Sequence, residues 1–256
     1  MMAAARHEIC AVALAEAFRG DGEILASPIG VLPQIAARLA RATFAPDLLL
    51  TDGVATLIGG VPPVGLGADA PVPVVEGWLP YRAIFDTVWS GRRHVVMGAS
   101  QIDRYGNQNI ACIGDPARPK VQLLGMRGAP GNTINHPTSY WVPAHGKRVF
   151  VAKVDVVTGV GYDRARALGP RASRFHDIRR VVTDLAVLDF QTPSRAMRLA
   201  SVHPGVTVAD VVERTGFPLI VDEPVPTTRL PTDHELRLLR EVIDPRGVGA
   251  REIAAA

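Results

Sequence analysis

The chain has 256 residues, of which 47% are hydrophobic and 21% charged, and its formal net charge is +3. This balance is typical of a globular protein with a sizeable core, and it excludes a chain that is disordered along its length. The sequence has no basic helix and no run of 18 apolar residues, so we expect neither a nucleic-acid partner nor a membrane span.

Helices are expected first near the N-terminus, where apolar residues recur at helical spacing from Ile9 to Phe18 and Gly20 follows as a stop. Pro28 opens a second helical stretch. Two late helices each begin after a threonine that is followed three residues later by an acidic residue, which is the pattern of a capping box. The predicted helices span residues 9–18, 28–42, 81–91, 208–216 and 233–243.

Short β-rich runs alternate with the helices in the first half of the chain, and residues 59–80 predict loops and irregular strands. This alternation predicts an α/β fold with an open, mostly parallel sheet flanked by helices, in a single domain over residues 1–256. The predicted strands lie at 23–26, 47–53, 93–100, 109–114, 121–125, 148–158 and, as a strand pair, 179–190.

The two cysteines, Cys10 and Cys112, lie in apolar contexts and are interpreted as small buried residues of a protein from a reducing compartment. The first twenty residues form an amphipathic pattern and not a signal sequence, so we expect a cytoplasmic location. The seven histidines are dispersed without metal-ligand spacing, and we expect no metal site.

A polar segment, VVMGASQIDRYGNQNIACIG, runs from residue 95 to 114 between two apolar stretches. Gln101, Asp103, Asn107 and Gln108 place amide and acid groups at the end of a predicted core strand. In parallel α/β sheets ligands bind at that edge, which makes these residues candidates for a site. A hydrogen-bonded turn around Tyr-Gly-Asn is the alternative, because such a turn uses the same side chains.

A glycine-rich segment, QLLGMRGAPGNTINHP, follows at residues 122–137. A predicted strand leads into Gly125, Gly128 and Gly131, and a helical turn is expected to begin at Asn132. Glycines allow backbone amides to converge on an anion or a developing oxyanion, and a helix start adds partial positive charge. Glycine-rich strand exits are also common without such a role.

Together these segments resemble the β-subunit side of the class I coenzyme A transferases. The strand-turn-strand signature of that family matches GASQID..GNQN, with Gln101, Asp103, Gly106 and Asn107 in register. The loop from residue 125 to 132 lies where the family has its glycine-rich thioester loop, which implies substrate binding by Gly125 and Asn132. The segments RVVTDLAVLDF and HPGVTVADVVERTGF match the C-terminal signatures, and the similarity is loose over the first 80 residues.

The resemblance implies the class I transferase fold and an α subunit of related fold, in a heterodimer or an α2β2 heterotetramer. It also implies a coenzyme A thioester as substrate, with no cofactor bound permanently. The polar segment would form part of the wall where the subunits meet around the acyl group. Gln101 and Asn107 would orient the acyl part or the partner's catalytic loop.

One departure from the family concerns the nucleophile, a glutamate that follows an early strand. The matching place is LLLTDGVATLIGG, which puts Asp52 where the glutamate stands. Aspartate is one methylene shorter, and a displacement of about 1 Å can cost on the order of 10²-fold in rate. A retained transferase mechanism is therefore disfavoured, and Asp52 is either a displaced active-site carboxylate or the cap of a turn.

Within the family, the segments RGAPGN, TINHPTSYWVPAHG and TGVGYDRA are similar to a branch of hydrolases that open a steroid-derived cyclic keto-acyl-CoA. This similarity implies retro-Claisen hydrolysis of a carbon–carbon bond, with the main base on the α subunit. Amides of Gly128 and Gly131 would stabilise the thioester enolate. Arg127 would hold an oxyanion or the substrate's free carboxylate, unless it is a surface arginine, and His136 could equally be a packed residue. A transferase that uses Asp52 or another carboxylate is one alternative, and a silent structural subunit is the other.

Overall fold

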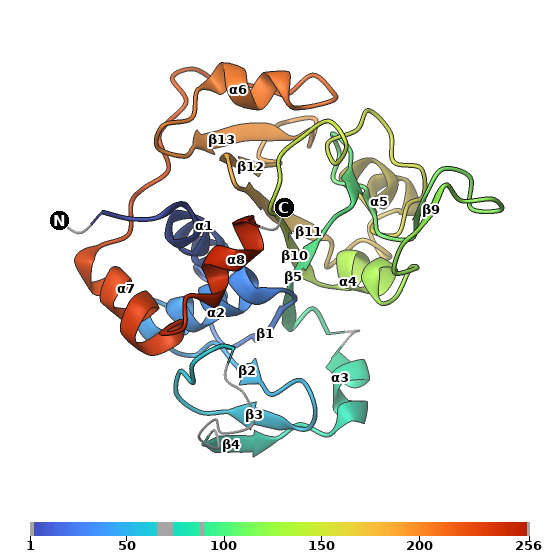
Figure 1. The fold of residues 1–256 in the computed structure, drawn as a ribbon. Coiled ribbons are helices and arrows are strands. Elements are labelled where there is room, and N and C mark those ends of the chain that lie inside the picture. The colour runs from blue at the N-terminus through green and yellow to red at the C-terminus, as the bar shows by residue number, and fades with distance from the viewer. Residues whose placement is uncertain (1–2, 66–73, 88–89, 255–256) are drawn as a thin grey trace. The chain divides into compact units, whose positions relative to one another are not determined.

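The computed structural model describes residues 3–65, 74–87 and 90–254. The chain forms two compact units, of which unit 1 comprises Met1–Met97 and Arg229–Ala256 and unit 2 comprises Gly98–Thr228. Figure 1 shows the course of the chain, coloured by residue number. The prediction of a single domain over residues 1–256 requires that the two units combine into one, and it stays a prediction.

Unit 1 contains a parallel strand pair, β1 and β5, together with a small antiparallel sheet of β2, β3 and β4 and most of the long helices. Register places Leu25 beside Arg93 and Pro28 beside Val96. The elements are α1 (Arg6–Ala15), η1 (Glu16–Phe18), β1 (Leu25–Pro28), α2 (Val31–Thr43), β2 (Leu50–Thr51), β3 (Thr56–Ile58), β4 (Val75–Trp78), α3 (Tyr81–Thr87), β5 (Arg93–Gly98), α7 (Asp233–Arg237), η2 (Leu238–Ile243) and α8 (Val248–Ala254).

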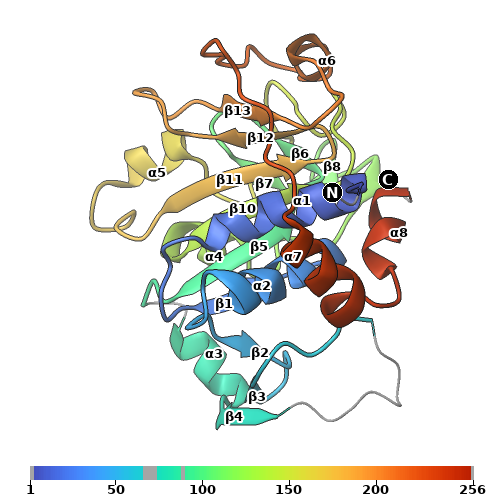
Figure 2. The ribbon, with the colours of Figure 1, turned by 90° about the vertical axis from the view of Figure 1, so that its left-hand side faces the viewer.

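The core of unit 1 lies around α2, which contacts α1, η2 and α8 (Figure 2). Leu32, Ile35 and Leu39 recur at helical spacing and are buried there. Burial of each such side chain contributes about 1.5–3 kcal/mol. The Glu252 carboxylate on α8 accepts a hydrogen bond from the Leu32 N–H at 2.6 Å, and thereby satisfies a backbone donor in the first turn of α2.

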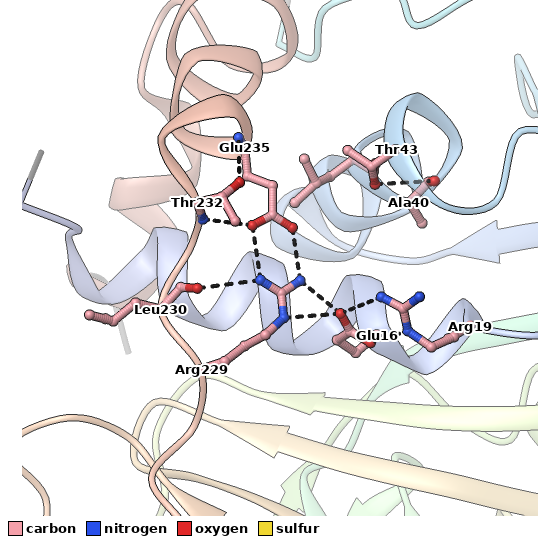
Figure 3. A network of polar contacts seen from close by, with 9 residues as sticks. Glu16, Arg19, Ala40, Thr43, Arg229, Leu230, Thr232 and Glu235 are labelled. Carbon is pink, nitrogen blue, oxygen red and sulfur yellow. Dashed lines mark hydrogen bonds and ion pairs between the residues drawn. The ribbon is translucent and has the colours of Figure 1, made fainter. Parts of the chain in front are cut away.

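An arginine-centred network joins η1 to α7 within unit 1 (Figure 3). Arg229 donates to Glu16 at 2.7 Å and to Glu235 at 2.8 Å, while Arg19 donates to Glu16 at 2.6 Å. The hydrogen bond from Arg19 lowers the pKa of Glu16 to about 2 against the opposing effect of burial, and Arg229 adds to the lowering. A guanidinium shared by two carboxylates fixes both helices more firmly than separate surface pairs would.

Unit 2 contains a second set of strands in which β10 and β11 are parallel, while β12 and β13 add in antiparallel directions. Two short hairpins, β6–β7 and β8–β9, precede this sheet. The elements are β6 (Gln101–Ile102), β7 (Gln108–Asn109), β8 (Cys112–Ile113), β9 (Val121–Gln122), α4 (Ala129–Asn135), β10 (Pro137–Val142), α5 (Tyr162–Leu168), β11 (Asp177–Thr183), β12 (Ala186–Asp189), β13 (Arg198–Val202) and α6 (Val208–Glu213).

Several predicted elements are confirmed. The run at 179–190 forms the expected strand pair, β11 and β12. Both capping boxes are present, because Thr207 accepts from the Asp210 N–H and Thr232 accepts from the Glu235 N–H, each at 3.1 Å. Both cysteines are buried. In the part of the chain that the structure describes, no helix is long and apolar enough to cross a membrane.

Two local predictions are wrong, and part of a third lies outside the described residues. Residues 148–158 form no strand, because their backbone pairs only with single residues of the neighbouring hairpin, such as Ile102 with Phe150. Helix α6 ends at Glu213 and not at Gly216, whose N–H instead donates to the Phe150 carbonyl at 2.9 Å. Residues 88 and 89 of the predicted helix at 81–91 lie outside the described residues.

Candidate active site

A cavity of about 190 Å³ lies in unit 1 at the ends of β1 and β2, against α2. Parallel strands bring their carboxyl ends to one edge of a sheet, and β1 ends at this place. The lining residues come from three elements and the turn after β2, and they are Ala26, Ser27, Pro28, Gln34, Arg38, Leu50, Thr51, Asp52 and Gly53.

Asp52 lies in this lining and caps the turn that follows β2. One carboxylate oxygen accepts from the N–H groups of Val54, Ala55 and Thr56 at 2.9–3.0 Å, and the other accepts from the Thr56 hydroxyl at 2.8 Å. Asp52 is exposed, and its slight desolvation raises its pKa, but the hydrogen bonds from Thr56, Val54 and Ala55 together outweigh this effect and hold the pKa well below its usual range. These contacts favour the turn-capping interpretation, because a carboxylate with four donors is a poor base or nucleophile.

In unit 2, the side chains of the polar segment hydrogen-bond to one another, to the loop at 148–161 and to the start of α5. The Gln101 amide oxygen accepts from Asn109 at 2.7 Å and from the Asp155 N–H at 2.9 Å, while the Gln101 amide nitrogen donates to the Asp155 carboxylate at 3.1 Å. Gln108 is fully buried and accepts from the Thr158 hydroxyl at 3.2 Å. The hairpin and the loop are therefore held together by amides.

Asn107 is the centre of a second group of contacts. Its amide nitrogen donates to the carboxylates of Asp103 and Asp163, both at 2.9 Å, and its oxygen accepts from the Gly161 N–H at 2.8 Å. Burial raises the pKa of Asp103, and the nearby Asp163 raises it further, whereas hydrogen bonds from Asn107 and Tyr105 act in the opposite direction. A β-carbon at Gly161 would lie 2.5 Å from the Asn107 backbone nitrogen, so only glycine fits there.

These contacts show that the polar segment has a structural role within unit 2. Gln101 and Asn107 are buried and use their amide groups on protein partners, which favours the hydrogen-bonded turn over direct contact with a ligand. Their predicted role in orienting an acyl group stays a prediction. Asp155, Asp163 and Thr158, which hold the segment, were not identified from the sequence because they lie about fifty positions away.

The glycine-rich segment forms an exposed turn that leads into α4. Gly125 has a φ of +80°, and α4 begins at Ala129, three residues before the predicted start at Asn132. The earlier start follows from Pro130, which lacks an N–H and is tolerated in the first turn of a helix. Gly131 and Asn132 consequently lie inside the helix, while Gly128 is its N-cap.

The side chains around this turn differ in exposure. Asn132 and His136 are buried, and burial of His136 favours the packed interpretation. Arg127 is exposed and has a φ of +50°, a backbone conformation that costs a residue with a β-carbon about 1–2 kcal/mol. Strain of this kind often occurs at functional sites, which supports a role for the Arg127 side chain.

The strain at Arg127 predicts a stability difference between two variants. Arg127→Gly is expected to unfold with a free energy about 1 kcal/mol higher than Arg127→Ala, because glycine adopts a positive φ without a β-carbon clash. Urea denaturation of both variants measures this difference. Equal stability of the two would show that the backbone at residue 127 relaxes in solution and stores no strain.

Comparison with known proteins identifies the family. Residues 84–214 match the family model described as Coenzyme A transferase. The chain is 54% identical over 249 residues to the IpdB subunit of the cholesterol ring-cleaving hydrolase of Rhodococcus jostii (strain RHA1), with 97% of this chain and 96% of the relative covered. The chain belongs to the coenzyme A transferase family.

Two transferase subunits are less similar to this chain, and one solved structure is about as similar as the Rhodococcus relative. Identity is 34% over 254 residues, 94% of both chains, to a subunit of the 3-oxoadipate CoA-transferase of Pseudomonas knackmussii. It is 31% over 258 residues to a subunit of the glutaconate CoA-transferase of Acidaminococcus fermentans, with 93% of this chain and 92% of the relative covered. The crystal structure of Rhodococcus jostii RHA1 IpdAB has a TM-score of 0.92 at 53% identity, covering 98% of this chain and 99% of that chain. The predicted family and fold are confirmed.

Proposed function

We propose that this chain is the β subunit of a cytoplasmic, two-subunit hydrolase that opens the ring of a cyclic keto-acyl-CoA during steroid breakdown. The observation that carries the proposal is the 54% identity, over 97% of the chain, to a cholesterol ring-cleaving hydrolase subunit, against 34% and 31% to subunits of two transferases. Coenzyme A is then part of the substrate, and no cofactor stays bound.

The reaction that we propose is a retro-Claisen hydrolysis. A base removes a proton from water, and the hydroxide adds to the ring carbonyl. The bond between that carbon and the carbon next to the thioester then breaks, the electron pair forms the thioester enolate, and the enolate takes up a proton. Because Asp52 is engaged by four donors, we assign the base to the partner subunit.

Within this scheme the glycine-rich turn supplies binding and electrostatics. We propose that amides of Gly125, Gly128 and Gly131 face the thioester, that Asn132 holds the turn, and that Arg127 contacts an oxyanion. Gln101 and Asn107 would then act indirectly, because they hold in place the protein segment that lies behind the acyl group. The exposed position of Arg127 supports its part in this assignment.

Two exposed apolar regions support an assembly with a second subunit of related fold. In unit 1, Trp78, Tyr81 and Phe85 are 73%, 65% and 55% exposed. In unit 2, Leu124 and Met126 next to the glycine-rich turn are 65% and 49% exposed. Large apolar side chains gathered on a surface are typical of contacts between proteins.

Co-expression with an α-type subunit tests the proposal. We expect light scattering to show a stable heteromer, and we expect the heteromer to open a cyclic keto-acyl-CoA without an acyl acceptor. A transferase would require an acceptor and would form a glutamyl- or aspartyl-type thioester that borohydride traps on the protein. A silent subunit would retain full activity in Arg127→Ala and Asn132→Ala variants.

The Asp52→Asn substitution separates the two enzyme mechanisms. The variant is expected to retain turnover within about threefold, because an amide oxygen still accepts from the turn and the residue takes no part in the proposed chemistry. Removal of a covalent nucleophile would instead lower turnover by on the order of 10³-fold or more. Asp52→Ala is the control for the cap, and its expected effect is a loss of stability of about 1–2 kcal/mol without the loss of turnover.

A further inference from the structure

The cavity beside Asp52 contains a cation that no described carboxylate neutralises. Arg38 projects from α2 into the lining, where its Nε donates to the Pro62 carbonyl at 2.7 Å and its Nη1 donates to the Gln34 carbonyl at 3.2 Å. Within the described ranges, neither an ion pair nor a hydrogen bond involves its Nη2 atom. Burial lowers the pKa of Arg38, which is the effect of removing a cation from water without an anionic partner.

A second arginine on the same helix, Arg41, has its charge paired with a carboxylate. Arg41 lies three residues further along α2, donates to the Ile58 carbonyl at 2.6 Å and pairs with the Glu76 carboxylate. It does not belong to the cavity lining. The two side chains lie on the same helix and each donates to a backbone carbonyl, but only Arg41 also pairs with a carboxylate of the protein.

The other charged residue in the lining, Asp52, does not compensate for Arg38. Its two oxygens accept four hydrogen bonds from the turn after β2, so its negative charge is stabilised by that turn. No ion pair joins the two residues in the described part of the chain. Of the two charged side chains in the lining, Arg38 is therefore the one that keeps a hydrogen-bond donor available to a ligand.

The lining also offers a hydroxyl donor. The Ser27 oxygen accepts a hydrogen bond from Arg93 at 2.7 Å, which leaves the hydroxyl proton of Ser27 to be donated. A guanidinium nitrogen together with a hydroxyl is a suitable donor set for a carboxylate, and the cavity volume of about 190 Å³ accommodates a short acyl terminus.

We propose that this cavity binds the free carboxylate of a dicarboxylic acyl-CoA, through Arg38 and the Ser27 hydroxyl. The inference rests on the proposed function, since it requires that the enzyme handles coenzyme A esters. Two family members are named for 3-oxoadipate and glutaconate, dicarboxylic acids whose monothioesters keep one free carboxylate.

Isothermal titration of the heteromer with two coenzyme A esters of matched chain length tests the proposal. The probes are glutaryl-CoA, which ends in a carboxylate, and pentanoyl-CoA, which ends in a methyl group. We expect the wild-type heteromer to bind glutaryl-CoA roughly ten- to a hundredfold more tightly, as a charge-assisted hydrogen bond predicts. Arg38→Gln is expected to remove this preference, and Arg41→Gln is expected to keep it.

Two further variants keep the test decisive if Arg38→Gln does not fold. Arg38→Lys is expected to retain part of the preference, and Ser27→Ala to reduce it about threefold with an unchanged melting temperature. Equal affinity of the wild-type protein for both probes would overturn the proposal, as would a variant at Arg38 that weakens both probes equally. Ring opening is measured separately, so failure of the proposed hydrolysis with an intact Arg38-dependent preference would be recognised as such.

Discussion

Replacement of Asn107 by alanine is expected to lower the free energy of unfolding by about 3–5 kcal/mol, which is an unusually large effect for one amide. Asn107 is almost completely buried, and its nitrogen donates to two carboxylates at once. Without it, the buried Asp103 and the exposed Asp163 would lose the donor that they share, and the Gly161 N–H would lose its acceptor.

Urea denaturation at neutral pH measures this effect, and two further variants interpret it. Asn107→Asp keeps the shape but adds a third carboxylate, so it is expected to be at least as destabilising near pH 7 and to recover part of the loss near pH 4. Asn135→Ala, at the half-buried end of α4, is expected to cost about 0.5 kcal/mol. A similar small cost for Asn107→Ala would mean that water replaces the amide and that the segment is not held as described.

Acid is expected to destabilise the protein by up to about 3 kcal/mol between pH 6.5 and pH 4 through His145. Burial, and to a smaller extent the charge of Arg214, lowers the pKa of His145 to about 4. The ring lies between the hydroxyls of Thr183 and Thr215, at 3.1 and 3.0 Å, and stacks on Phe150. This environment accommodates the neutral ring.

The direction of the pH dependence follows from which state, folded or unfolded, binds the proton at His145. Below pH 6.5 the unfolded chain takes up a proton at His145 and the folded protein does not, so stability is complete above pH 6.5 and falls until the folded pKa near 4 is reached. Denaturation midpoints at several pH values in this window should therefore slope in wild type and lose much of the slope in His145→Asn. The exposed His234 provides the matched control, and His234→Asn should retain the wild-type slope.

Elements with local chemical signals could be predicted from the sequence, and elements defined by distant partners could not. The capping boxes at Thr207 and Thr232 were predicted because each one is completed within four residues. Strand β10 was missed because it begins at Pro137 and carries two fully buried polar residues, Thr138 and Ser139, which obscure a strand pattern. The opposite error arose at 148–158, where an alternating valine pattern belongs to a loop.

The same reasoning applies to the candidate site. The polar segment and the glycine-rich turn were found because their compositions are unusual over a short stretch of sequence. Arg38 gave no such signal, since an arginine on an amphipathic helix is ordinarily solvated. Only the tertiary placement of α2 beside the ends of β1 and β2 shows that its guanidinium faces a cavity.

The connectivity of unit 1 has a consequence for synthesis on the ribosome. The chain leaves this unit at Met97 and returns at Arg229, after the whole of unit 2 has been translated. At about 5–20 residues per second, on the order of ten seconds pass before the return. During that interval the apolar face of α2 has emerged without α8, and Glu16 has emerged without Arg229. Unit 2 is continuous, so the nascent protein can complete its second unit before its first.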